Sequence, residues 1–223
     1  MPVLRVVDLS VPLGPGTQVY PGDPEVRLEA HATVHEDGFN LLRVAMGSQS
    51  GTHVDAPFHV DDGGARLDAL PLGRFVGPGV VVDGTGVGER GAIGWEVLAP
   101  YADRFGPGVV VLIRTDWSAR YGTPAYLDHP SLDPDACRRL LGTGVRTIGI
   151  DAPSVDPTGS AADGAASLPA HHLVARAGGV IAENLTGLGA VDFPDPLVVL
   201  LPVPLEGADG APVRAVALQV GQV

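Results

Sequence analysis

The most informative stretch of the chain runs Gln49-Ser50-Gly51-Thr52-His53-Val54-Asp55-Ala56-Pro57-Phe58-His59. Its chemically active side chains fall on odd positions, and an extended backbone would project them to one face because strand side chains alternate with a period of two. His53 and Asp55 would then stand side by side, where an imidazole and a carboxylate can share one divalent cation. Gly51 permits close approach of the backbone, and Pro57 marks an edge or the end of the strand. The alternative is a polar strand face at the surface, with His59 an ordinary solvated histidine.

A divalent cation needs more than two protein ligands, and a second segment offers further donors. A short helix is expected at 169–176, with His171 in its first turn and Gly178 after its end. Five helical residues advance about 8 Å and four strand residues return about 13 Å, so Glu183, in a strand at 180–183, can arrive near His171. Glu183 is also the lone acid of an apolar strand, a costly position unless it is paired or metal-bound. Alternatively, His171 is a polar residue at a helix start and Glu183 a satisfied buried acid. The spacing alone does not decide between His171 and His172.

Composition restricts the classes of partner. The chain has 223 residues and a formal net charge of −12, which disfavours nucleic acid and anionic membranes because both attract basic surfaces. All 14 basic residues are arginine, so Schiff-base chemistry on lysine is excluded. The N-terminal residues lack the layout of a secretion signal, and no apolar run approaches the roughly 20 residues of a membrane span. The single cysteine, Cys137, is expected to be a packing residue. We therefore expect a cytoplasmic protein with a small-molecule substrate.

The order of expected elements indicates the fold class. Strands are expected at 3–9, 25–35, 40–48, 80–83, 109–114, 145–151, 180–183, 197–203 and 213–220, and helices at 93–104, 134–141 and 169–176. Asp133 is the expected N-cap of the second helix, with Pro134 at its first position. Strands that alternate with helices indicate an α/β fold with a mixed sheet. Thirty-one Gly and 21 Pro are spread along the chain without a break, which favours one domain over residues 1–223.

With these residues assembled, the chain resembles the cyclase family of metal-dependent hydrolases, whose best-known members are the bacterial kynurenine formamidases (arylformamidases). The family motif reads His-x-Gly-Thr-His-x-Asp-x-Pro-x-His, and residues 51–59 match every fixed position after the first. The resemblance covers nearly the whole chain. It includes Asp8-Leu9-Ser10 with Pro12, Tyr20-Pro21-Gly22-Asp23-Pro24, Arg114-Thr115-Asp116-Trp117, Gly149-Ile150-Asp151-Ala152-Pro153-Ser154-Val155-Asp156, and His171 with Glu183-Asn184-Leu185.

The resemblance implies a site and an assembly. It implies one or two divalent ions, zinc or manganese, and it favours His171 over His172; the ligands implied are His53, Asp55, His171 and Glu183. It implies that His59 is the catalytic acid/base and that the aromatic ring of Tyr20 lines the substrate pocket. Similar proteins form homodimers around a swivelling β/β/α core, which agrees with the fold class expected from the strands and helices.

One position departs from the motif. Gln49 stands where the formamidases have their first histidine, normally a metal ligand. Glutamine can coordinate through its amide oxygen, but as a weaker and harder donor than imidazole, which would favour a single ion or manganese over zinc. Gln49 is kept as a candidate ligand. Phe58 is a candidate for the aromatic wall of the pocket, with a core position as the alternative.

Three functions follow as hypotheses. The first is metal-dependent hydrolysis of a small amide, lactam or ester, with His59 moving the proton between water and the leaving group. The second keeps the fold and makes the chain a ring-closing cyclase of aromatic polyketide biosynthesis, in which His59 removes a proton next to a carbonyl. The third is a metal-free protein that binds a small molecule, which the substitution at Gln49 would favour.

Overall fold

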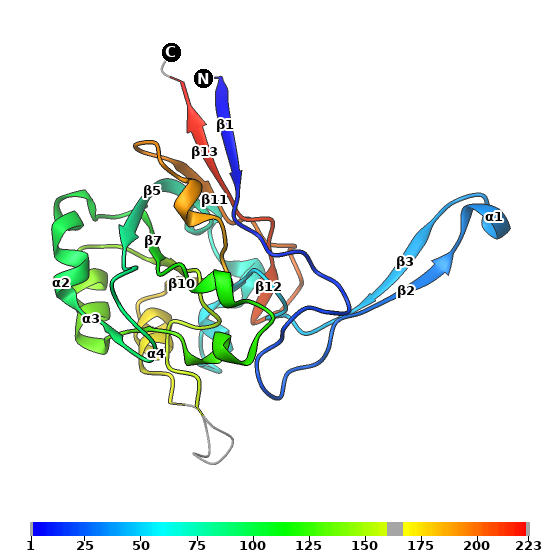
Figure 1. Cartoon of the computed structure of the whole chain (residues 1–223), viewed down its shortest axis with the longest axis horizontal. Helices are drawn as coiled ribbons and strands as arrows, with labels where there is room; N and C mark the ends of the chain where they lie inside the picture. The colour runs from blue at the N-terminus through cyan, green and yellow to red at the C-terminus, as the bar shows by residue number, and fades with distance from the viewer. Residues whose placement is uncertain (1, 160–166, 222–223) are drawn as a thin grey trace.

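One mixed sheet runs through the body of the molecule. The structure, a computed structural model, describes residues 2–159 and 167–221 (Figure 1). In spatial order the nine strands of the sheet are β1 (Val3–Asp8), β13 (Val216–Val220), β11 (Leu197–Val199), β5 (Val76–Asp83), β7 (Val110–Arg114), β9 (Thr147–Ile150), β10 (Val180–Glu183), β4 (His53–Asp55) and β12 (Gly210–Pro212). Strands β5, β7, β9 and β10 pair in parallel, and the remaining pairs are antiparallel. The α/β class with a mixed sheet is therefore confirmed.

The parallel centre of the sheet is buried on both faces. Its strands are short apolar runs, as expected where two layers cover a sheet, and residues 110–113 of β7 are at most 1% exposed. Helices α2 (Trp95–Leu98), α3 (Pro134–Gly142) and α4 (Pro169–Arg176) gather at one side of the sheet (Figure 1). One apolar cluster joins β5, β7 and β9 to these helices. A second cluster joins β7 and β10 to the antiparallel strands β1, β11 and β13 of the same sheet.

Helix α3 begins and packs as its sequence predicts. The carboxylate of Asp133 accepts hydrogen bonds from the backbone N–H groups of Asp135 and Ala136, and Pro134 occupies the first turn. Cys137 lies on the buried face of this helix, and burial raises the pKa of its thiol to about 12. Its interpretation as a packing residue is consistent with both observations.

Some helix boundaries differ from those expected from the sequence. The helix expected at 93–104 is divided into β6 (Ala92–Ile93), α2 and a 3₁₀ helix, Ala99–Arg104. Pro100 lies in the first turn of this 3₁₀ helix, where the missing N–H of proline is tolerated. Strand β6 pairs with β8 (Ser131–Leu132), a short pairing that sequence periodicity did not predict. No helix among the described residues combines the length and apolar character needed to cross a membrane.

A hairpin arm projects from the body. It consists of β2 (Arg27–Ala32), β3 (Leu41–Ala45) and the single-turn helix α1 (Val34–Asp37) at its tip (Figure 1). The strands expected at 25–35 and 40–48 are shortened because Thr33 caps α1 and Gly38 ends it in a left-handed conformation, with φ of 80°. As a result His35 lies in α1, whereas His31 lies in β2 as expected.

Candidate metal centre

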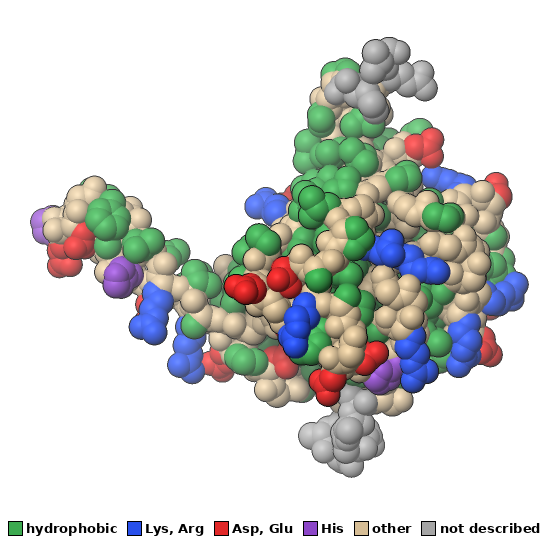
Figure 2. Space-filling model, turned by 180° about the vertical axis from the view of Figure 1, so that it is seen from behind, with side chains coloured by type: hydrophobic (Ala, Val, Ile, Leu, Met, Phe, Trp, Pro, Cys, Tyr) green, Lys and Arg blue, Asp and Glu red, His purple; other side chains and the backbone are tan. Residues whose placement is uncertain are grey.

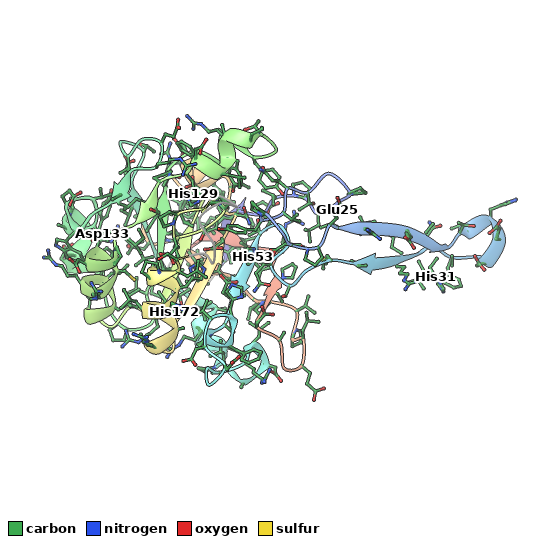
Figure 3. All side chains as sticks on the ribbon, turned by 90° about the horizontal axis from the view of Figure 1, so that it is seen from below. Glu25, His31, His53, His129, Asp133 and His172 are labelled. Carbon is green, nitrogen blue, oxygen red and sulfur yellow. The ribbon has the colours of Figure 1, made fainter. Side chains whose placement is uncertain are left out.

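Four donor side chains converge beside the last parallel strand. β4 supplies His53 and Asp55, β10 supplies Glu183, and α4 supplies His171. Strands β4 and β10 are antiparallel neighbours in which Glu183 pairs directly with His53. Helix α4 leads through the turn at 177–179 into β10, and this connection returns Glu183 to His171. All four residues are buried, with at most 5% exposed, and His53 lies in the interior of the body (Figure 3).

The motif segment folds differently from one extended strand. Only residues 53–55 form β4, which follows a turn in which the backbone N–H of Ser50 donates to the carbonyl of Gly47; Pro57–His59 then forms a 3₁₀ helix. Gly51 has a left-handed φ of 62°, and a Cβ there would lie 2.7 Å from the Leu13 side chain. His53 and Asp55 therefore share one face of a strand as expected, whereas Gln49 reaches the same site from a turn and His59 from the 3₁₀ helix.

The distance from each imidazole to the two carboxylates fits ligands of a divalent cation. Nε2 of His53 lies 3.5 Å from Asp55 and 3.6 Å from Glu183, and Nε2 of His171 lies 3.7 Å and 3.4 Å from the same two carboxylates. Ligands bound about 2.1 Å from a tetrahedral cation are separated from one another by roughly 3.4 Å. Three of the donors, His53, Asp55 and Glu183, also lie within 4.8 Å of one another.

Both imidazoles are oriented with Nε2 toward the cluster. Nδ1 of His53 lies 2.8 Å from the carbonyl oxygen of Gly51, and Nδ1 of His171 lies 2.7 Å from Asp156. A histidine that donates from Nδ1 keeps the lone pair of Nε2 for a metal. Among the described residues, Nε2 of His53 and Oδ2 of Asp55 are buried without any hydrogen-bond partner. A buried donor set with such orphaned atoms is chemically suited to a divalent cation.

Two further residues, Asp156 and Asn184, hold this arrangement. Asp156 is fully buried and also accepts from the backbone N–H groups of Ala170 and His171, which fixes the start of α4. Asp156 belongs to a block of the family resemblance, but its contact with His171 could not be predicted from the sequence. Asn184 follows the donor Glu183 in a left-handed conformation and donates to the carbonyl of Gly51, 3.0 Å away. Neither contact has a signal in local periodicity, because each one joins distant segments.

The electrostatics of the cluster favour positive charge. Burial disfavours the charged imidazoles, but the carboxylates of Asp55 and Glu183 outweigh it and raise the pKa of His53 to about 9. Glu183 and Asp156 likewise outweigh burial and raise the pKa of His171 to about 10. For Asp55 burial acts in the opposite direction, yet His53 and His171 hold the pKa of this carboxyl below its usual range. The metal-free cluster therefore holds protons where a cation would sit.

Gln49 and His59 lie at the edge of the cluster. Gln49 places its amide nitrogen 3.0 Å from Oδ1 of Asp55 and 3.2 Å from Nδ1 of His59. Because a carboxylate only accepts hydrogen bonds, the group that faces Asp55 must be the NH₂ of Gln49 and not its oxygen. His59 is half-buried, and its Nδ1 lies 3.1 Å from Asp209, a residue that the sequence did not identify.

A cavity of about 120 Å³ opens onto these donors. Its described walls include His53, His59, His171 and Glu183 together with Tyr20. The second ring is that of Tyr126, which is almost fully buried and donates its hydroxyl to Asn184. Phe58 does not line this cavity and instead lies under the guanidinium of Arg66, 3.7 Å from the ring centre. The exposed His172 and the buried His129 are not among the lining residues.

Replacing Asp156 with asparagine tests how His171 is held. The substitution keeps the size of the side chain but weakens the bond to Nδ1 of His171, and loss of such a partner typically lowers metal affinity about 10- to 100-fold. Competition titration with a chromophoric chelator measures the change. Asp133→Asn, which retains the N-cap of α3, is the matched control and should bind metal normally. Equal affinity of Asp156→Asn and wild type would contradict the assignment.

The raised pKa values predict that metal binding releases protons. At about pH 7.5 the imidazoles of His53 and His171 are protonated in the metal-free protein, because their pKa values are raised to about 9 and about 10. A cation that binds to both rings must therefore displace about two protons. Metal affinity should therefore increase as the pH rises toward the raised pKa values. Calorimetry in two buffers of different ionisation enthalpy counts the protons released. A binding enthalpy that is independent of the buffer would show that the imidazoles were already neutral.

Comparison with known proteins identifies the family. The model of the Cyclase family matches residues 7–157. The kynurenine formamidase of Geobacillus thermodenitrificans (strain NG80-2) is 36% identical to this chain, with 96% of this chain and 98% of the relative covered. That of Paracidovorax citrulli (strain AAC00-1) is also 36% identical, with 94% of each chain covered.

Solved structures agree with this similarity. An isatin hydrolase bound to the product analogue thioisatinate superposes with a TM-score of 0.85 at 28% identity, covering 96% of this chain and 92% of the other. Isatin hydrolase A from Labrenzia aggregata, bound to benzyl benzoate, gives a TM-score of 0.85 at 27% identity, covering 96% and 93%. These matches confirm the resemblance inferred from the motif: the chain is a hydrolase and belongs to the Cyclase family.

Proposed function

We propose that the chain is a divalent-metal-dependent hydrolase that cleaves the carbon–nitrogen bond of a small aryl or cyclic amide. The observation that carries the proposal is the buried set of two imidazoles and two carboxylates at the end of a cavity, with orphaned atoms on His53 and Asp55. The donor set also argues against a metal-free binding protein, which has no need to bury His53, Asp55, His171 and Glu183 together.

In this proposal four residues would hold the cation and a fifth would transfer protons. His53, Asp55, His171 and Glu183 would hold a cation, zinc or manganese. The chemistry that such a cation supplies is a lowered pKa of water and polarisation of a carbonyl group. His59 lies beside the cluster, with its ring centre 5.9 Å from that of His171, where it can take a proton from water and pass it to the leaving nitrogen.

The cavity supports a small, partly aromatic substrate. Apolar side chains of Val19, Leu127 and Leu168 line the wall with the rings of Tyr20 and Tyr126. The related proteins are named for hydrolysis of kynurenine-type formamides and of isatin, and one structure holds thioisatinate. Both kinds of name describe an amide next to an aromatic ring. A planar aryl formamide and a ring-fused lactam are therefore the first substrates to test.

Gln49 supports a single cation. In a two-ion site a ligand at this position would offer a lone pair, but Gln49 turns its amide N–H toward Oδ1 of Asp55. This hydrogen bond uses an oxygen lone pair that a second cation would require. We therefore propose one cation per chain, with Gln49 as a hydrogen-bond donor beside it.

Activity measurements test the reaction and the role of His59. The protein loaded with Mn²⁺ or Zn²⁺ should hydrolyse an aryl formamide or an isatin-like lactam, and a chelator should abolish activity until metal is restored. His59→Gln should lower kcat by about 100- to 10,000-fold with metal content retained, since general acid–base catalysis contributes this much. Wild-type kcat in His59→Gln would refute the acid–base role. Activity that survives removal of all metal would refute the proposed function.

Metal analysis tests the role of Gln49. We expect about one ion per chain in wild type and about two in Gln49→His, because imidazole restores a metal donor at this position. Gln49→Ala is the control for lost hydrogen bonds and should keep one ion. Two ions per wild-type chain would overturn the proposal of a single cation.

We also propose that the chain acts as a homodimer through its hairpin arm. Exposed apolar side chains follow the arm, among them Val34, Phe39, Leu41, Leu42 and Val44, all 48–60% exposed. Figure 2 shows hydrophobic side chains along the projecting arm. A two-stranded hairpin is marginally stable alone in water, and contiguous exposed apolar surface is typical of interaction sites. A second copy of the chain would cover this surface.

Light scattering coupled to size exclusion tests the assembly. Wild type should elute as a dimer, and Leu42→Glu combined with Val44→Glu should elute as a monomer, because charges would be buried in the interface. Leu72→Glu places the same charge at an exposed leucine of the body and should leave the dimer intact. A monomeric wild type, or a dimeric double variant, would contradict the arm as the interface.

A further inference from the structure

The contacts of His59 raise the question of which ring nitrogen carries its proton. Nδ1 lies between two groups of opposite character: the amide nitrogen of Gln49 at 3.2 Å and Oδ2 of Asp209 at 3.1 Å. If Nδ1 is protonated, it donates to Asp209. If Nδ1 is unprotonated, it accepts from Gln49 and turns a lone pair toward the Asp209 carboxylate, which is repulsive.

The position of Asp209 is fixed by the fold. Its backbone carbonyl accepts from the N–H of Ala56, one residue before the 3₁₀ helix that ends at His59. The next residue, Gly210, starts β12 and pairs with Asp55. A Cβ on Gly210 would lie 2.5 Å from both the Gln49 amide and the carbonyl of Val54, so only glycine allows this approach.

A second hydrogen bond orients the Asp209 carboxylate. Ser48 donates its hydroxyl to Oδ1, 2.9 Å away, which leaves Oδ2 for His59. His59 outweighs partial burial and, with the Ser48 hydroxyl, holds the pKa of Asp209 below its usual range. The group facing Nδ1 is therefore an ionised carboxylate. Ser48 holds its side chain, and the N–H of Ala56 holds its backbone.

We propose that Asp209, anchored by Ser48, is a positioning residue that holds the proton of His59 on Nδ1 and leaves Nε2 as the nitrogen that exchanges protons with water and substrate. A base must present a lone pair to the water that it deprotonates, and the tautomer with its proton on Nδ1 does so at Nε2. After proton uptake at Nε2, the N–H on Nδ1 remains hydrogen-bonded to Asp209, which stabilises the imidazolium. Gln49 then donates to Asp55 and makes no bond to Nδ1.

This inference rests on the proposed acid–base role of His59, and a double-mutant cycle separates the two. Asp209→Asn should lower kcat by about 100-fold, with KM and metal content close to wild type, because the amide group introduced at this position permits the other tautomer. In a His59→Gln background the same substitution should cause no further loss, since Asp209 acts only through His59. Ser48→Ala should give a smaller loss in kcat. Glu206→Gln, an exposed acid three residues away, is the matched control and should behave as wild type.

Nitrogen-15 NMR of the metal-loaded protein gives a readout that does not depend on activity. The His59 ring signal, assigned by its absence in His59→Gln, should show a protonated Nδ1 in wild type and a shift toward protonated Nε2 in Asp209→Asn. The inference is overturned if wild type carries its proton on Nε2 in the neutral ring. It is also overturned if Asp209→Asn keeps full kcat or if its loss adds to that of His59→Gln.

The outcomes for the two proposals can be told apart. If His59→Gln loses activity and Asp209→Asn does not, the positioning role fails and the proposed function stands. If His59→Gln keeps full activity, the acid–base role fails, and the catalytic importance of Asp209 fails with it.

Discussion

The site depends on burying carboxylates together. Asp55, Glu183 and Asp156 are each at most 5% exposed and lie around two imidazoles in one small volume. Removing an ionised carboxylate from water costs several kcal/mol unless positive charge and hydrogen bonds compensate. In this chain the compensation comes from His53 and His171, and the orphaned atoms show that it is incomplete without a cation. The same incomplete compensation that costs stability in the metal-free protein would give the site its affinity for metal.

The fold supplies the rigidity that this cluster requires. Two donors lie on β4 and one on β10, at the point where the parallel centre of the sheet meets an antiparallel pair. Backbone pairing fixes these three side chains, and Asp156 fixes the fourth by binding both the ring and the backbone N–H of His171. The residues proposed to meet substrate, His59 and Tyr20, come instead from a 3₁₀ helix and a loop. The candidate metal donors thus lie on strands and a helix, whereas the residues proposed to meet substrate lie on short connecting segments.

Sequence patterns predicted correctly those helices and strands whose formation depends on residues close together in the chain. The strand at 180–183, the helix at 169–176 and the N-cap of α3 are present as expected, because each depends on neighbours in the sequence. The approach of His171 to Glu183 also followed from the lengths of one helix and one strand. Periodicity described the motif segment less well, since Gln49 reaches the site from a turn and His59 from a 3₁₀ helix. Asp209 and Tyr126 were missed because they approach the site from segments far away in the chain, and no spacing rule connects them to it.

Anomalous X-ray scattering from crystals grown with Mn²⁺ or Zn²⁺ tests the central claim most directly. We predict one peak about 2.0–2.2 Å from Nε2 of His53, from Nε2 of His171 and from an oxygen each of Asp55 and Glu183. Gln49 should lie beside this peak with its amide nitrogen turned toward Asp55. A fully active crystal with no peak within bonding distance of these four side chains would contradict the account.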